Sequence, residues 1–90
     1  GVTIPEVERP PVEVDLRGMR VDEAIEKLDR ALDQALLAGL KEVRVIHGKG
    51  TGALRDAVKE FCRAHTGVAS ARMADQWDGG TGATLIQLEG

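Results

Sequence analysis

Two helical patterns of apolar residues, set between short strand-like segments, constrain the fold of this chain more than any other feature. Over residues 21–38 the apolar side chains recur every three or four positions, and the same spacing returns over residues 53–65. This spacing predicts two helices that each bury one face. Short alternating or apolar runs predict four strands, at residues 12–16, 41–47, 68–74 and 83–88.

The resulting βαβαββ order predicts an α/β fold. Two successive β-α-β units imply right-handed crossovers and parallel pairing among the first strands. The last two strands are expected to form a hairpin with a long loop, which makes the four-stranded sheet mixed. Two helices suffice to cover one face of such a sheet, so we expect a two-layer sandwich. All three prolines lie in residues 1–11, which predicts a flexible linker before a folded domain at residues 12–90.

The composition is that of a globular protein, because 42% of the residues are hydrophobic and 30% are charged. No apolar run approaches the roughly 18 residues that cross a bilayer, and no signal-peptide pattern is present, so no membrane partner is expected. The single cysteine, Cys62, cannot form an internal disulfide, which favours the reducing cytoplasm. The first residue is Gly1 rather than Met, which favours a fragment of a longer protein.

A glycine-rich segment follows the second predicted strand. It reads His47-Gly48-Lys49-Gly50-Thr51-Gly52. The missing Cβ atoms allow an anion to approach backbone N–H groups at the N-terminus of the second helix. Lys49 adds a positive charge, and His47 can act as an acid or a base near neutral pH. The alternative is a tight turn that only packs the helix on the sheet.

Two known phosphate-binding loops do not fit this segment. The Walker A motif requires G-x-x-x-x-G-K-[ST], which the segment does not contain. The dinucleotide fingerprint would use Gly48, Gly50 and Ala53, but no acidic residue follows at a strand end about 20 residues later. A nucleotide-binding fragment is therefore disfavoured.

Basic side chains are concentrated in the second half of the chain. The net charge is −3, yet residues 43–72 hold six basic side chains against two acidic ones. Arg55, Lys59 and Arg63 are each four residues apart and share one face of the second helix. Such a row can follow a phosphodiester backbone. The alternative is a solvated helix surface with paired charges.

Candidate chemical groups lie at the ends of the first two predicted strands. Because parallel strands end at the same edge of a sheet, Asp15, Arg17 and His47 are expected to converge there. An acid, a guanidinium and an imidazole at one edge can orient a phosphodiester and move protons. The glycine-rich segment at residues 78–84 reaches the same edge if the last strand runs antiparallel.

Three segments together resemble the Smr (small MutS-related) domain family. V-D-L-R-G at 14–18 resembles its first motif, L-D-L-[HR]-G; H-G-K-G-T-G at 47–52 resembles its H-G-x-G motif; and G-G-T-G-A-T at 79–84 resembles its closing glycine motif. Arg17 and Lys49 make the sequence most similar to the C-terminal Smr domain of bacterial MutS2 proteins. Residues 76–78 depart from the proline or glutamate that relatives often carry there.

The resemblance implies a fold like the C-terminal domain of translation initiation factor three. It implies an endonuclease that nicks DNA, including branched DNA, with RNA cleavage or ribosome association in some relatives. It also implies a parent MutS2 chain that suppresses homologous recombination. A non-catalytic nucleic-acid or ribosome-binding module is the alternative, because it would use the same residues.

Residue roles follow from the motifs and from the basic helix face. His47 is expected to be the general acid or base, Asp15 to orient it or help hold a metal ion, and Arg17 to bind the phosphate. Phosphate contacts carry no sequence information, so cutting is expected to be weakly sequence-specific. The residues expected to bind nucleic acid are Gly48, Lys49, Gly50, Gly52, Arg55, Lys59, Arg63, Gly80 and Gly82.

No cofactor is certain from the sequence. Asp15, Asp75 and Asp78 could share a divalent cation such as Mg²⁺ or Mn²⁺, although their spacing is not diagnostic, and no Cys/His zinc pattern is present. Cys62 and His65 lie on the apolar stripe of the second helix and are expected in the core. Trp77 either caps the apolar layer or stacks on a base.

Overall fold

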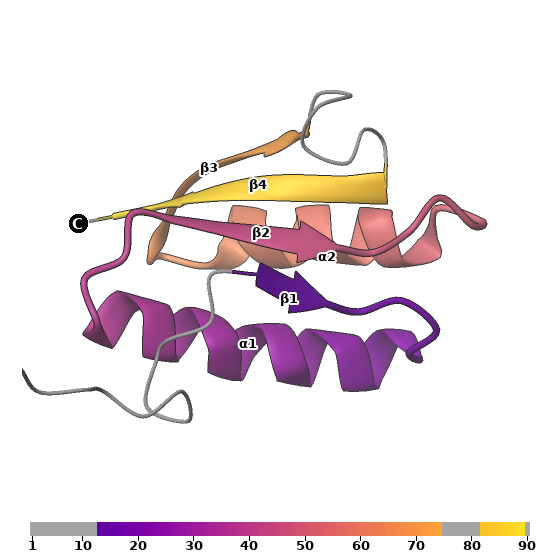
Figure 1. Cartoon of the computed structure of the whole chain (residues 1–90), viewed down its shortest axis with the longest axis horizontal. Helices are drawn as coiled ribbons and strands as arrows, with labels where there is room; N and C mark the ends of the chain where they lie inside the picture. The colour runs from indigo at the N-terminus through magenta and orange to yellow at the C-terminus, as the bar shows by residue number, and fades with distance from the viewer. Residues whose placement is uncertain (1–12, 75–81, 90) are drawn as a thin grey trace, which may run out of the picture.

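The computed structural model describes residues 13–74 and 82–89, and its six elements follow the predicted order (Figure 1). They are β1 (Glu13–Asp15), α1 (Val21–Leu37), β2 (Glu42–Ile46), α2 (Ala53–Ala64), β3 (Val68–Met73) and β4 (Ala83–Leu88). The predicted linker at 1–11 lies outside the described residues. Each predicted element is present, and the ends agree to within about two residues.

The four strands form one mixed sheet in the order β1-β2-β4-β3. β1 pairs parallel to β2, whereas β4 runs antiparallel to both β2 and β3. The predicted parallel pairing therefore holds for β1 and β2, and the predicted β3–β4 hairpin is confirmed. β3 does not pair with β2, because β4 lies between these two strands. The predicted parallel pairing therefore does not extend to β3.

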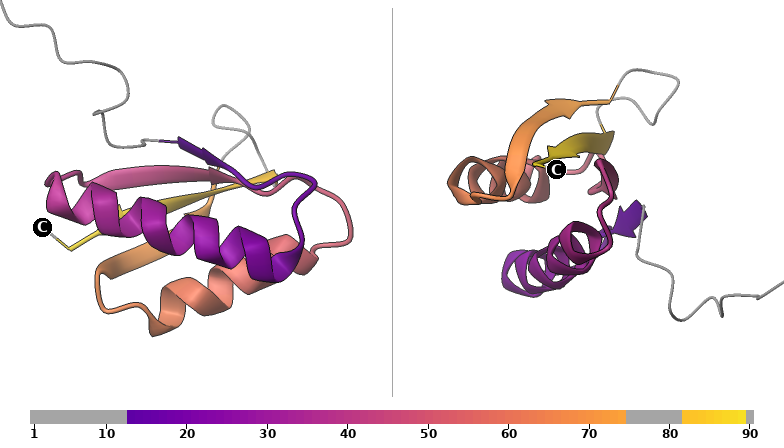
Figure 2. Two further views of the ribbon diagram at one scale, coloured as in Figure 1. Left: turned by 90° about the horizontal axis from the view of Figure 1, so that it is seen from below. Right: turned by 90° about the vertical axis from the view of Figure 1, so that its left-hand side faces the viewer.

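Both helices cover the same face of the sheet, which confirms the two-layer sandwich (Figure 2). Alternate side chains of the strands face these helices. The fully buried core combines strand and helix residues, among them Val43, Val45, Ile86, Leu28, Leu32 and Val58. The opposite face carries Asp15, Arg44 and Leu85 at the intervening positions.

The helices match most of their predicted faces, but His65 at the end of α2, expected in the core, is only half-buried. Ala24, Leu28, Leu32 and Ala35 on α1 are buried as expected, but Val21 is exposed because it occupies the first position of the helix. Cys62 is buried in the core, as predicted, and burial raises the pKa of its thiol to about 11. Among the described residues, neither helix is long and apolar enough to cross a membrane.

Candidate functional site

The first two motifs and the end of the third meet at one edge of the sheet. The N–H groups of His47 and Gly48 both donate to the carbonyl oxygen of Gly82, at 3.0 and 2.9 Å. The N–H of Leu16, inside the first motif, donates to the carbonyl of Ile46 at 2.7 Å. Because β4 is antiparallel to β2, its first residues lie beside the end of β2, and the predicted convergence of these segments is confirmed.

Arg17 and Asp15 form a fixed pair on the exposed side of this edge. The Arg17 backbone N–H and Nε each donate to Asp15 Oδ1 at 3.0 Å, and Nη2 donates to Oδ2 at 2.8 Å. These bonds lower the pKa of the Asp15 carboxyl from its ordinary value of 3.8 to about 2, and Asp15 in turn raises the pKa of Arg17. Asp15 is therefore ionised near neutral pH, and the guanidinium has a defined orientation.

His47 lies on the other side of the sheet, beneath the glycine-rich segment. Its side chain is directed to the helix-covered face, and the residue is 4% exposed. Nδ1 donates to the Gly48 carbonyl at 3.0 Å, because a carbonyl can only accept, and Nε2 is 2.9 Å from Thr84 Oγ1. Both ring nitrogens are thus engaged inside the protein.

The expected contact between Asp15 and His47 is corrected by this geometry. Asp15 pairs with Ile46, the neighbour of His47, so its side chain is directed to the opposite face of the sheet. Its carboxylate binds Arg17, and Thr84 takes the position next to the imidazole that Asp15 was expected to fill. Sequence reasoning missed Thr84, although a hydroxyl at the start of a mostly apolar strand marked it as a polar group needing a partner.

The glycine-rich segment leads into α2 with free backbone donors. Gly52, at φ +89°, is the N-cap of α2 and provides no side-chain hydrogen bond to the helix. Within residues 13–74 and 82–89, the N–H groups of Gly50 and Gly52 make no hydrogen bond. Gly48 has φ +80°, a backbone conformation that favours glycine. A Cβ at this position would lie 3.4 Å from Arg17 Cγ. These donors, with the positive end of the helix dipole, favour an anion.

Two open cavities flank Arg17 at this edge. One, of about 530 Å³, lies on the helix side, and its walls include Arg17, His47, Gly48, Gly50, Gly52 and Arg55. The other, of about 340 Å³, lies on the opposite side and is lined by Arg17, Arg44, Ile46, Gly48, Lys49, Gly82 and Ala83. Most of the predicted site therefore surrounds one basic edge. Lys59 and Arg63 lie farther along α2, and Gly80 is outside the described residues.

Arg44 is a basic residue near this edge that the sequence interpretation did not assign to the site. It lies on β2 and pairs with Glu13 on β1. The signal was present in the alternation of β2, where a basic residue between Val43 and Val45 must face away from the helices. Its side chain contributes to the wall of the cavity that also contains Lys49.

The described residues at this edge do not form a metal site. Both Asp15 oxygens accept hydrogen bonds from Arg17, and the predicted partners Asp75 and Asp78 lie outside the described residues. A separate cluster contains Asp29, Asp33 and His65, away from the three motifs. There the His65 Nδ1 accepts from the Gly67 N–H at 2.9 Å, so the neutral ring carries its proton on Nε2 and has no lone pair left for an ion.

Comparisons with known proteins agree with this arrangement. A family model described as Smr domain matches residues 14–89. The chain is 46% identical to "Endonuclease MutS2" of Exiguobacterium sibiricum over 99% of its length, and 52% identical to that of Thermomicrobium roseum over 97%. It spans only 11% of the length of each of these relatives.

Solved structures give the same result. The Smr domain of Thermus thermophilus MutS2 superimposes with a TM-score of 0.85 at 46% identity, covering 87% of this chain and 98% of that one. YdaL, a stand-alone small MutS-related protein of Escherichia coli, gives a TM-score of 0.81 at 28% identity, covering 88% of this chain and 65% of that one. The match of sequence, motifs and architecture places this chain in the Smr domain family.

Proposed function

We propose that this domain is an endonuclease domain that nicks DNA with weak sequence specificity. The observation that carries the proposal is the edge where Arg17, Lys49 and the glycine-rich start of α2 surround two adjoining cavities. Its basic and amide groups suit a phosphodiester, and they read charge rather than base identity. The name endonuclease, borne by similar full-length MutS2 proteins, supports the same activity.

Phosphate binding would use groups that are already oriented. Asp15 holds the Arg17 guanidinium by two side-chain hydrogen bonds, so less conformational freedom is lost when a phosphate binds. Lys49 is exposed beside Gly82, and the free N–H groups of Gly50 and Gly52 add donors that need no side-chain movement. Together these groups would stabilise the extra negative charge that develops on phosphorus during hydrolysis.

Cleavage of the phosphodiester also requires two proton transfers. Hydrolysis adds water across a P–O bond, so one group takes a proton from water and another gives a proton to the leaving oxygen. Asp15 is not suited to take the first proton, because its pKa is about 2 and both of its oxygens accept hydrogen bonds from Arg17, so that proton would pass to solvent water. His47 would supply the second after its hydrogen bond to Gly48 or Thr84 opens.

The burial of His47 favours a second candidate, a nucleic-acid or ribosome-binding module that does not cut. Both imidazole nitrogens make hydrogen bonds within the protein, although His47 borders the larger cavity. His47 would then position the glycine-rich segment, while Arg17 and Lys49 bind phosphate. The partner would be DNA, branched DNA or RNA, because the phosphate is common to all three.

The wider role follows only from the family. We propose that the domain acts as part of a MutS2 chain in the cytoplasm and that the parent protein suppresses homologous recombination. Similar MutS2 chains, of which this domain spans 11%, support a larger parent protein. The proposal assigns no site to a divalent cation, because the described carboxylates at the edge already form ion pairs with arginines. The cation is therefore varied in the experiment.

A plasmid-nicking assay and a parallel binding measurement at different salt concentrations test the two candidates. The domain is incubated with supercoiled plasmid in magnesium, manganese or chelator, beside Lys49→Ala, His47→Ala and a matched control, Lys41→Ala, at the opposite end of β2. The proposal expects nicking by the wild type and Lys41→Ala, weak binding by Lys49→Ala, and binding without nicking by His47→Ala. Salt-dependent binding without nicking in any condition would favour the binding module.

A further inference from the structure

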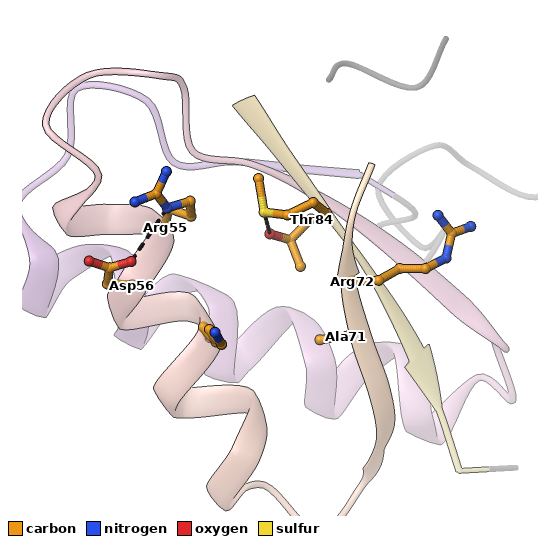
Figure 3. A pocket seen from close by; sticks show the side chains of 7 residues that line it. Arg55, Asp56, Ala71, Arg72 and Thr84 are labelled. Atoms are coloured by element: carbon orange, nitrogen blue, oxygen red, sulfur yellow. Dashed lines mark hydrogen bonds and ion pairs between the residues drawn. The ribbon is translucent and has the colours of Figure 1, made fainter. Parts of the chain in front are cut away.

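A groove runs between α2 and β3, beyond the site formed by the three motifs (Figure 3). It consists of two neighbouring cavities of about 500 and 380 Å³, which share Lys59 and Ala71 in their walls. The first also contains Arg55, Met73 and Thr84. The groove therefore follows α2 from its first turn to its last.

The α2 wall of the groove is basic. Arg55, Lys59 and Arg63 line it in sequence, and the two acidic residues of α2 each pair with an arginine. Arg55 Nε lies 3.4 Å from Asp56 Oδ1, and Arg63 Nη1 lies 3.1 Å from Glu60 Oε1. Lys59 makes no ion pair with any residue in 13–74 or 82–89. The wall thus keeps an unneutralised positive charge at its centre.

The β3 wall of the groove presents apolar side chains to α2, and Arg72 borders the larger cavity between them. Ala71 and Met73 pair with Ile86 and Thr84, which face the helices, so these two side chains face α2. Arg72 lies between them and extends to the other side of the strand (Figure 3). Met73 is 39% exposed, so part of its apolar side chain is accessible from the groove.

The groove is continuous with the proposed phosphate site. Arg55 lines both the larger groove cavity and the cavity of the glycine-rich segment. Thr84 Oγ1 lies 2.9 Å from His47 Nε2 and 3.9 Å from Met73 Sδ, so the floor of the groove contacts the motif histidine through one hydroxyl. A strand whose phosphate sits at the glycine-rich segment would have its neighbouring nucleotides beside this groove.

We propose that the α2–β3 groove binds an unpaired segment of DNA that flanks the phosphate held at the motif edge. This inference rests on the proposed function and adds a substrate class to it. The cations of α2 complement the backbone of the strand, and the apolar surface of Ala71 and Met73 complements the face of a base. In a continuous duplex the base faces are stacked and cannot reach that surface without flipping.

The Arg55 guanidinium and the Met73 thioether provide suitable contacts for a base. A guanidinium plane stacks on nucleobases, and a polarizable sulfur packs favourably against aromatic rings. A double-stranded backbone would meet the basic wall but leave the apolar wall unmatched. The preferred substrate is therefore DNA with a single-stranded region next to the cleavage point, as at a branch or a gap.

Fluorescence anisotropy with labelled oligonucleotides tests the groove directly. The probes are an oligothymidine of about 12 nucleotides, an oligouridine of the same length and a duplex of the same length. Ala71→Phe fills the groove from an exposed position, Ala71→Leu fills it less, and Ala38→Phe adds the same ring at the end of α1. Circular dichroism and thermal melting establish that each variant is folded.

The expected result is selective. Ala71→Phe weakens oligothymidine binding by about 10-fold, with a smaller loss for Ala71→Leu, and leaves duplex binding and the Ala38→Phe control within about two-fold of wild type. Equal losses for single strand and duplex, or no loss, would overturn the groove assignment while wild-type binding still supports the phosphate site. A loss confined to oligouridine would replace DNA by RNA as the occupant. Failure of the wild type to bind any probe would refute the phosphate site itself.

Discussion

At the scale of single residues, the candidate site depends on the Asp15 carboxylate, which orients the Arg17 guanidinium. Asp15 fixes Arg17 through a backbone and two side-chain hydrogen bonds, yet both side chains remain accessible. A neutralised arginine is a weaker anion receptor than a free one, but it is already oriented. The pair therefore provides a well-oriented guanidinium with little net charge. Lys49 supplies a positive charge at the same edge.

The Asp15 pair can be tested by titration. We expect the Asp15 carboxyl to titrate at about pH 2 in the wild type and at a higher pH, closer to its ordinary 3.8, in Arg17→Ala, because the guanidinium stabilises the ionised form while the backbone N–H of residue 17 remains. Because the folded-state pKa is lowered, the pair stabilises the fold above about pH 4, and the contribution is lost as the pH falls through 2. Carboxyl chemical shifts in ¹³C NMR measure both midpoints, and unchanged titration in Arg17→Ala would contradict the pairing.

Cys62 provides a residue-scale test of the core. Burial raises its thiol pKa from 9.0 to about 11, which lowers the thiolate fraction near pH 8 about 100-fold. The folded domain should therefore react with a thiol reagent at least about 100-fold more slowly than the domain in denaturant. Absorbance of the released chromophore follows the rate, and equal rates in the two conditions would mean that Cys62 is not buried.

At the scale of elements, strand alternation decides which side chains can act together. Sequence patterns located each helix and strand, since periodicity of 3.6 or 2 residues is a local property. They did not separate Asp15 from His47, because neighbouring register positions bring two residues to the same edge while directing them to opposite faces. That separation depends on the pairing of Asp15 with Ile46, which no local pattern contains.

The order of the strands was also beyond local patterns. The insertion of β4 between β2 and β3 depends on long-range pairings. A sheet with another strand order would satisfy the same alternation of side chains. The hydrogen bond between His47 and Thr84 follows from this insertion, since Val45 pairs with Thr84 across the two strands. Thus the sequence identified the motif residues of the site, whereas the partner of its histidine required the sheet.

The start of α2 gives an element-scale prediction. Gly52 has φ +89°, so Gly52→Ala forces a side chain into a left-handed conformation and should destabilise the domain by about 1–2 kcal/mol. Gly50→Ala is the matched control, because its φ is not positive and its Cβ would meet no atom within 4 Å. Urea unfolding measures both changes, and a Gly50→Ala loss as large as that of Gly52→Ala would contradict the left-handed cap.

At the scale of the whole molecule, the proposed binding of nucleic acid depends on local charge rather than on net charge. The net charge is −3, but positive charge gathers at the motif edge and along the α2 wall of the groove. An anionic polymer would therefore meet the domain in one orientation.

The salt dependence of binding tests that view. Affinity for single-stranded DNA should fall steeply as salt increases, because each phosphate contact releases counterions. Lys59→Ala should reduce the slope of log K against log salt by about 1, whereas Lys41→Ala should leave the slope unchanged. Anisotropy titrations at several salt concentrations give the slopes, and a Lys59→Ala slope equal to that of the wild type would remove the α2 row from the binding surface.

The position of β4 in the middle of the sheet also determines how the chain can fold as it is made. β4 is the last of the six elements in sequence, yet it supplies the only described link between β2 and β3. A nascent chain that has not yet extended past β4 can form α1 and α2, but it cannot close the sheet beneath them. The domain therefore completes its core, and with it the partner of His47, in one late cooperative step that depends on distant pairings and is slower than helix formation.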